Sequence, residues 1–207
     1  MIPPAMTIPK STISTVIADK VKLADNGSLF FSNSFPEYDD EYVGHIMSDL
    51  VKDGQLYRIG RGVYLKTVAT RFGLVYPSVD TIARSIAERD KAEVLPTGAM
   101  ALNILGLSTQ VPMNPTFITS GSARVINIGG HSITFKRAVP KNFAIKGQKR
   151  RLIVQALKAI GEKDITEEEY FKIGNIIRTY PETESYESDL QAMPIWIRRV
   201  FQKFATK

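Results

Sequence analysis

Residues 39–66 read DDEYVGHIMSDLVKDGQLYRIGRGVYLK, and this stretch decides the fold of the N-terminal part of the chain. Asp39 or Asp40 is placed to cap a helix. The apolar residues that follow recur at helical spacing and form one face: Val43, Ile46, Met47, Leu50 and Val51. Asp53-Gly54 should end the helix, because glycine adopts the left-handed conformation at a helix C-terminus without strain.

Two short runs rich in β-branched and aromatic residues follow this helix, Gln55–Ile59 and Gly62–Lys66. Gly60-Arg61 lies between them, so the pattern predicts a β-hairpin with a tight turn. A helix followed by a two-stranded hairpin forms the back half of a winged helix-turn-helix. Such a helix fits the major groove of B-DNA, which is about 12 Å wide.

The segment before this stretch predicts the front half of the same fold. Ser11 or Thr12 can cap a helix that runs to about Ala24, where Asp25-Asn26-Gly27 supplies turn chemistry. Leu29–Tyr38 is expected to hold a short strand and a degenerate helix. We therefore expect an α+β protein whose first domain, residues 10–68, is a winged helix-turn-helix.

The outward face of the predicted helix and its hairpin carries side chains that can bind duplex DNA. Polar helix residues can bond base edges or phosphates, and cations on the hairpin would meet the backbone or a narrow minor groove. The candidate DNA-binding residues are Tyr42, His45, Ser48, Lys52, Arg58 and Arg61. The alternative is a helix-hairpin unit that serves dimerisation or packing.

The balance of basic and acidic residues in this domain disfavours strong DNA binding by the domain alone. Residues 1–70 contain seven Lys and Arg against eight Asp and Glu, so this part is near neutral. Asp39, Asp40 and Glu41 favour the helix dipole, but carboxylates at that end repel phosphate. We therefore expect binding to require a homodimer on DNA, or cations from elsewhere in the chain.

Thr67–Pro77 is expected to be a linker or the start of a second domain. The rest of the chain, residues 76–207, predicts a mixed α/β domain that ends in several helices. Gly129-Gly130 is a hairpin turn signal between the strand-like runs Arg124–Ile128 and His131–Arg137. Thr166 followed by Glu169 is a capping box. Pro194 fits the first turn of a final helix.

No Asp or Glu occurs between Val94 and Gly161, which predicts a basic face on this second domain. Lys149-Arg150-Arg151 opens a helix, where backbone N–H groups attract anions, so a phosphate site is expected there. The alternative is a solvated loop. The candidate phosphate- or partner-binding residues are Arg124, Lys136, Arg137, Lys141, Lys149, Arg150 and Arg151.

Composition excludes several classes of site. The chain of 207 residues has no cysteine and only two histidines, His45 and His131, so disulfides, thiol catalysis and cysteine-ligated zinc are excluded. Its net charge of +6 favours an anionic partner.

Met1–Lys10 resembles neither a secretory signal nor an anchor, and no stretch approaches the roughly 20 apolar residues of a spanning helix. We expect a cytoplasmic protein without membrane contact, metal or cofactor, and not an enzyme, because no catalytic constellation is evident.

Two stretches together suggest a family. Leu50–Tyr64, LVKDGQLYRIGRGVY, resembles the helix-to-wing signature of AbiEi-type antitoxins from bacterial type IV toxin–antitoxin (abortive infection) systems. Leu95–Pro112, LPTGAMALNILGLSTQVP, looks like the second block of these proteins. A short β-rich stretch with Thr119 and Gly121 follows, and then Phe135-Lys136-Arg137. The resemblance covers about residues 39–142.

The resemblance implies a separate function for each of the two domains. The winged domain would bind operator double-stranded DNA and repress its own operon, and the second domain would carry antitoxin function. The partner would be a nucleotidyltransferase-like toxin, a functional partner that need not contact this chain. Two other functions stay open: an RNA- or nucleotide-binding protein acting through Arg124–Arg151, and an interaction module that covers a partner enzyme.

Overall fold

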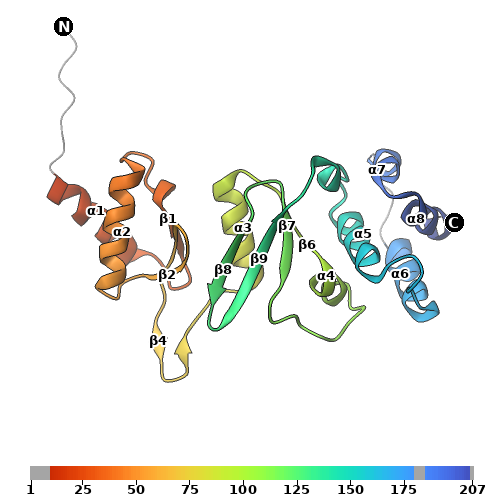
Figure 1. The fold of residues 1–207 in the computed structure, drawn as a ribbon, viewed down its shortest axis with the longest axis horizontal. Helices are drawn as coiled ribbons and strands as arrows, with labels where there is room; N and C mark the ends of the chain where they lie inside the picture. The colour runs from red at the N-terminus through yellow and green to blue at the C-terminus, as the bar shows by residue number, and fades with distance from the viewer. Residues whose placement is uncertain (1–9, 180–184, 206–207) are drawn as a thin grey trace, which may run out of the picture. The chain divides into compact units, whose positions relative to one another are not determined.

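The computed structural model describes residues 10–179 and 185–205, and it is a mixed α/β structure (Figure 1). The chain divides into two compact units. Unit 1 contains the described residues up to Ser85 together with Ile126–Gly130, and unit 2 contains Ile86–Val125 and the described residues from His131 onward. In the described part of the chain, no helix has the length and apolar character needed to cross a membrane.

Unit 1 alternates helices with a small antiparallel sheet. Its first six elements are α1 (Lys10–Leu23), β1 (Leu29–Phe31), the 3₁₀ turn η1 (Ser32–Ser34), α2 (Asp40–Lys52), β2 (Tyr57–Gly60) and β3 (Val63–Leu65). The sheet order is β1-β3-β2, so the last strand lies between the other two. Leu65 is the register partner of Leu29 on one side and Tyr57 on the other. All three residues of β3 are buried, as a central strand requires.

The core of unit 1 joins both helices to the sheet. Its buried residues are Ile17, Val21, Phe35, Val43, Ile46, Met47, Leu50, Leu56 and Tyr64. The helical face predicted for α2 supplies four of these, which confirms the periodicity argument for this element. Lys66, just after β3, donates from Nζ to the carbonyl oxygen of Ala24 at 2.5 Å. Ala24 directly follows α1, so this bond satisfies a carbonyl at the helix end that has no partner within the helix.

The predicted linker holds a second hairpin instead. β4 (Ala69–Thr70) and β5 (Gly73–Leu74) pair antiparallel around an Arg71-Phe72 turn. The Thr70 hydroxyl donates to the carbonyl of Gly73 at 2.9 Å and accepts from the Phe72 N–H at 3.2 Å. Strands of two residues are too short to show alternation, and the segment therefore has no strand signal in the sequence.

The remaining elements place one four-stranded sheet among helices. They are α3 (Val79–Asp90), β6 (Val94–Pro96), α4 (Gly98–Ile104), β7 (Thr116–Thr119), β8 (Arg124–Ile128), β9 (His131–Arg137), the 3₁₀ turn η2 (Pro140–Phe143), α5 (Gln148–Ile160), α6 (Glu167–Thr179), α7 (Tyr186–Ala192) and α8 (Ile195–Ala205). The strand order is β6-β7-β9-β8. Gly129 and Gly130 both have positive φ between β8 and β9, which confirms the predicted turn.

The pairing of β7 with β9 is parallel, which the turn signals of the sequence do not indicate. Phe117 is the register partner of Phe135, and their rings stack with centroids 5.7 Å apart. β9 passes between β7 and β8, so the strand after the Gly-Gly turn reaches a partner from earlier in the chain. Turn chemistry identifies the hairpin, but long-range strand order depends on packing that a single sequence does not display.

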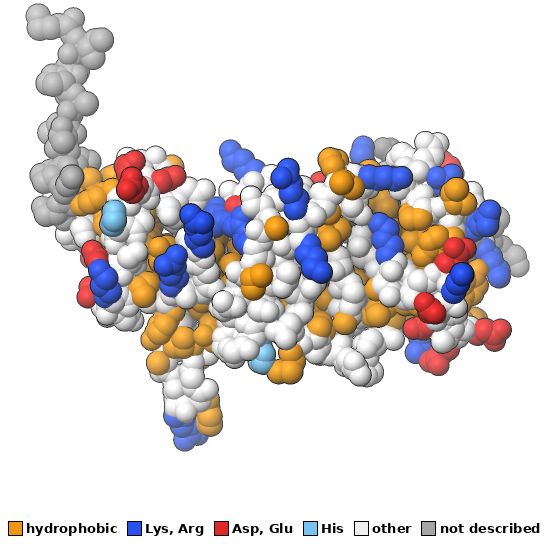
Figure 2. All heavy atoms as spheres, in the orientation of Figure 1, with side chains coloured by type: hydrophobic (Ala, Val, Ile, Leu, Met, Phe, Trp, Pro, Cys, Tyr) orange, Lys and Arg blue, Asp and Glu red, His pale blue; other side chains and the backbone are white. Residues whose placement is uncertain are grey.

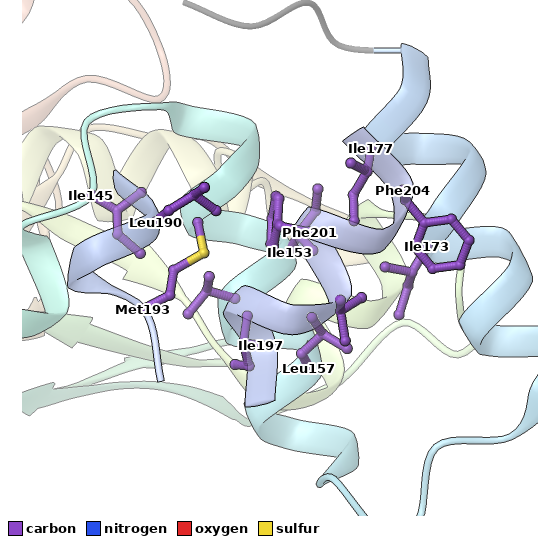
Figure 3. Close-up of a cluster of buried hydrophobic side chains, with 12 residues drawn as sticks. Ile145, Ile153, Leu157, Ile173, Ile177, Leu190, Met193, Ile197, Phe201 and Phe204 are labelled. Atoms are coloured by element: carbon purple, nitrogen blue, oxygen red, sulfur yellow. The ribbon is translucent and has the colours of Figure 1, made fainter. Parts of the chain in front are cut away.

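The last four helices share one apolar core (Figure 3). Its fully or nearly buried residues are Ile145, Ile153, Val154, Leu157, Ile173, Ile177, Leu190, Met193, Ile197, Val200, Phe201 and Phe204. The capping box at the start of α6 is confirmed. Thr166 Oγ1 accepts from the Glu169 N–H at 3.2 Å, and Glu169 Oε2 accepts from the Thr166 N–H at 2.9 Å.

The same substitution should have opposite effects at two helical glycines. A Cβ on Gly174 in α6 would lie 2.6 Å from Cδ1 of Phe204, whose ring is buried in α8, whereas Gly44 in α2 has only Ser32 Oγ at 3.8 Å. We expect Gly174→Ala to destabilise by about 1–3 kcal/mol through overpacking. Gly44→Ala should stabilise by about 0.5–1 kcal/mol through backbone entropy.

Urea unfolding checks both expectations. Trp196, the only tryptophan, packs against the core that contains Phe204, so its fluorescence reports that region for Gly174→Ala. Circular dichroism serves for Gly44→Ala. Equal effects at both positions would show that the contact with Phe204 does not control helix packing.

Candidate nucleic-acid interface

α2 is held by caps that the sequence predicts. Asp39 is the N-cap, and its Oδ1 accepts from the Tyr42 N–H at 2.9 Å. At the other end Gly54 has φ +71°, and the N–H groups of Gln55 and Leu56 both donate to the Leu50 carbonyl. These bonds fix where the chain leaves α2 and enters the hairpin.

The face of α2 opposite the core presents the predicted helix residues to different extents. His45 and Lys52 are exposed, while Tyr42 and Ser48 are half-buried. The Ser48 hydroxyl donates to the Gly44 carbonyl at 2.8 Å, so only its oxygen lone pairs remain for an external donor. Lys52 Nζ lies 2.7 Å from Asp49 Oδ1, and this exposed pair raises the pKa of Lys52. Lys52 stays charged, but Asp49 compensates part of its field.

The hairpin after α2 carries two exposed arginines. The turn is Arg61-Gly62, and Gly62 has φ +65°, so the left-handed residue is this glycine rather than Gly60 in the predicted Gly60-Arg61 turn. The β2–β3 register shifts between Arg58 and Gly60, which marks a bulge. Arg58 Nε donates to the Gly60 carbonyl at 3.3 Å. Neither Arg58 nor Arg61 pairs with a carboxylate among the residues that the structure describes.

Two of the predicted unit 2 cations bind carboxylates at the surface of their own unit. Arg124 lies 2.5 Å from Asp90, and Arg151 pairs with Glu93 while also donating to the carbonyl of Phe143. Both arginine side chains are mostly covered. Their charges therefore hold the sheet and α5 in place and contribute little to an outward field.

Arg150 differs most from the expected phosphate site. It is buried, and its Nε lies 2.7 Å from Oδ2 of Asp189, which is completely buried. Asp189 also accepts from the backbone N–H groups of Lys146 at 2.7 Å and Gly147 at 3.0 Å. The start of α5 does attract an anion, as expected, but the anion is a carboxylate of the chain itself.

The remaining predicted residues of the basic face, Lys136, Arg137, Lys141 and Lys149, are exposed. Figure 2 shows Lys and Arg side chains on the drawn face of this unit. Unit 2 therefore has a basic surface that includes these four residues, whereas Arg124, Arg150 and Arg151 bind carboxylates of the chain itself. The Asp189 partnership escaped the sequence argument because 39 residues separate the two side chains.

Comparison with protein families places the chain in a family. A family model described as a family of unknown function, DUF6088, matches residues 16–185, which is most of the chain. The chain belongs to DUF6088. The match in DUF6088 spans α2, the hairpin, the four-stranded sheet and α5, so both candidate surfaces lie inside it. No curated protein matches this DUF6088 chain.

Proposed function

We propose that unit 1 is a winged helix-turn-helix domain that binds duplex DNA and that the protein is a transcriptional regulator rather than an enzyme. The order α1-β1-η1-α2-β2-β3 with sheet order β1-β3-β2 supports this proposal. In this reading η1 and the following turn replace the first helix of the helix-turn-helix, α2 is the recognition helix and β2–β3 is the wing.

The observation that carries the proposal is the pair of exposed arginines on the hairpin that follows α2. Arg58 and Arg61 are solvent-exposed on the wing, and the described acidic residues leave them uncompensated. Surface arginines without an internal carboxylate partner are suited to phosphate, which they bind through a planar fork of donors. The carboxylates of Asp40 and Glu41 at the start of α2 repel phosphate and so oppose the attraction by the two arginines. Two protomers on one operator would double the number of cations that contact the DNA.

Fluorescence anisotropy tests the proposal with a labelled duplex taken from the promoter region upstream of the gene that encodes this chain. We expect affinity to fall steeply as salt rises, because each phosphate contact releases counterions. A single-stranded RNA of equal length should bind more weakly. Absence of salt-dependent binding to any duplex would leave unit 1 as a packing or dimerisation unit.

The antitoxin role is the second part of the proposal, and the resemblance of Leu50–Tyr64 and Leu95–Pro112 to AbiEi-type antitoxins supports it. Expression of the neighbouring reading frame, with and without this chain, tests it. Growth arrest that this chain relieves would support an antitoxin, and a harmless neighbour would contradict it. A promoter reporter in the same cells separates autorepression from toxin relief.

Nucleic-acid binding through Lys149-Arg150-Arg151 has less support. Arg150 and Arg151 bind Asp189 and Glu93, so an incoming phosphate would have to displace carboxylates that already satisfy them. The exposed lysines of unit 2 can still add to a general positive field.

A further inference from the structure

A pocket of about 270 Å³ in unit 2 is lined by η2 and residues on either side of it, by α5, and by the end of α7 with the residue just before α8. Its apolar walls are Val139, Ile145, Val154, Ala192 and Pro194. Its polar lining is Lys141, Asn142 and Lys158. We call it the lysine pocket.

The two ammonium groups of the lysine pocket have no carboxylate partner among the described residues. Lys158 Nζ donates to Oδ1 of Asn142 at 3.0 Å, which is a neutral acceptor. Burial lowers the pKa of Lys158, and the nearby charge of Lys141 lowers this pKa further. The two cations therefore repel each other across a partly apolar space.

This arrangement contrasts with the arginines of the same unit. Arg124, Arg150 and Arg151 each hold a carboxylate from a distant segment, namely Asp90, Asp189 and Glu93. η2 and α5 lie within Val94–Gly161, which contains no acidic residue, so these elements cannot neutralise their own lysines. The fold supplies internal anions for three arginines and none, among the described residues, for the lysine pair.

We propose that the lysine pocket binds the phosphate dianion of inorganic phosphate or of a terminal phosphate monoester. Such a group carries about −1.5 to −2 charge at pH 7 and presents three strong acceptor oxygens. It can accept from both ammonium groups at once, and the apolar walls strengthen these charge-assisted bonds. A backbone diester carries a single charge and compensates only one lysine. This site is separate from the proposed DNA surface of unit 1 and does not depend on it.

Thermal unfolding of the full chain in sodium phosphate, at constant ionic strength balanced with sodium chloride, tests the site. The Tm of the wild type should rise with phosphate concentration by mass action and then level off as the site fills. Lys141→Met and Lys158→Met should weaken phosphate affinity at least about tenfold, since each removes a charge-assisted hydrogen bond. Lys163→Met, which removes an exposed lysine outside the pocket, should respond like the wild type.

A second readout separates ligand binding from a structural role. Without phosphate, the Tm of Lys158→Met should equal or exceed that of the wild type, because the substitution removes repulsion. A nucleoside 5′-monophosphate should stabilise the protein, and the unphosphorylated nucleoside should not. The ligand that binds more tightly, inorganic phosphate or the nucleoside monophosphate, identifies which of the two kinds of phosphate the pocket takes.

Three results would overturn the proposal. These are an equal rise of Tm in chloride alone, retention of phosphate affinity in both pocket variants, and competition of phosphate with a duplex that lacks terminal phosphates. The last result would assign the pocket to a nucleic-acid backbone instead.

Discussion

Asp189→Asn is expected to destabilise the protein by about 3–5 kcal/mol, the usual cost of breaking a buried ion pair by removing one partner. Asp189 is fully buried and holds Arg150 as well as the backbone N–H groups of Lys146 and Gly147. The amide carries no charge, so the guanidinium of Arg150 loses the buried carboxylate that it binds at 2.7 Å. Urea unfolding followed by Trp196 fluorescence measures the loss.

Glu168→Gln is the matched control for this prediction. It also removes one carboxylate of an ion pair, with Lys172, but both side chains of that pair are exposed. Exposed pairs contribute about 0–1 kcal/mol, so the control should change stability little. A loss of similar size in both variants would show that Asp189 has no special part in holding α5 and α7 together.

The pH dependence of stability follows from the same site. Burial alone would raise the pKa of the Asp189 carboxyl, but the hydrogen bonds from Lys146, Gly147 and Arg150 hold this pKa below its ordinary value. The unfolded chain therefore takes up the proton first, near pH 3.9. The stabilisation is complete above that pH and is lost as pH falls toward the folded pKa. Asp189→Asn should show a flatter decline of stability over that acidic range.

Arg58→Ala combined with Arg61→Ala is expected to weaken duplex binding about 100-fold. Each hydrogen bond to a charged group contributes about 1.5 kcal/mol or more, and about 1.4 kcal/mol corresponds to a factor of ten. The slope of log K against log salt should become shallower by about two, one for each lost phosphate contact. Anisotropy titrations over a series of salt concentrations measure both quantities.

A double variant with the same charge change controls for a general loss of positive field. Arg84→Ala with Lys172→Ala removes two exposed cations that pair with Asp80 and Glu168. We expect its affinity to stay within a few-fold of the wild type, because neither cation belongs to the α2–wing surface. If the control weakened binding as much as the wing variant, net charge rather than the wing would determine affinity.

Local signals in the sequence predicted α2 and the hairpin that follows it well. The Asp39 cap, the apolar face of α2 and the left-handed Gly54 all act within one or two turns of chain, where spacing alone is informative. β4 and β5 were missed because each has two residues. The parallel pairing of β7 with β9 has no local signal in the sequence, because it depends on long-range packing.

The candidate sites show the same division between local and distant information. Arg58 and Arg61 lie on an exposed hairpin, as their place in a strand-turn-strand pattern indicates. The run Lys149-Arg150-Arg151 reads as one basic cluster, but Arg150 points to Asp189 and Arg151 to Glu93. Counting charges along the chain cannot show that distant carboxylates neutralise them.

The most direct test of DNA binding by unit 1 is a map of the residues that a duplex perturbs. Backbone amide spectra of the ¹⁵N-labelled full chain would be recorded during titration with the promoter duplex. We predict that the largest shifts occur at the exposed face of α2 and at Arg58–Gly62 of the wing. Shifts confined to unit 2, or the absence of shifts in α2 and the wing at saturating duplex, would contradict the account.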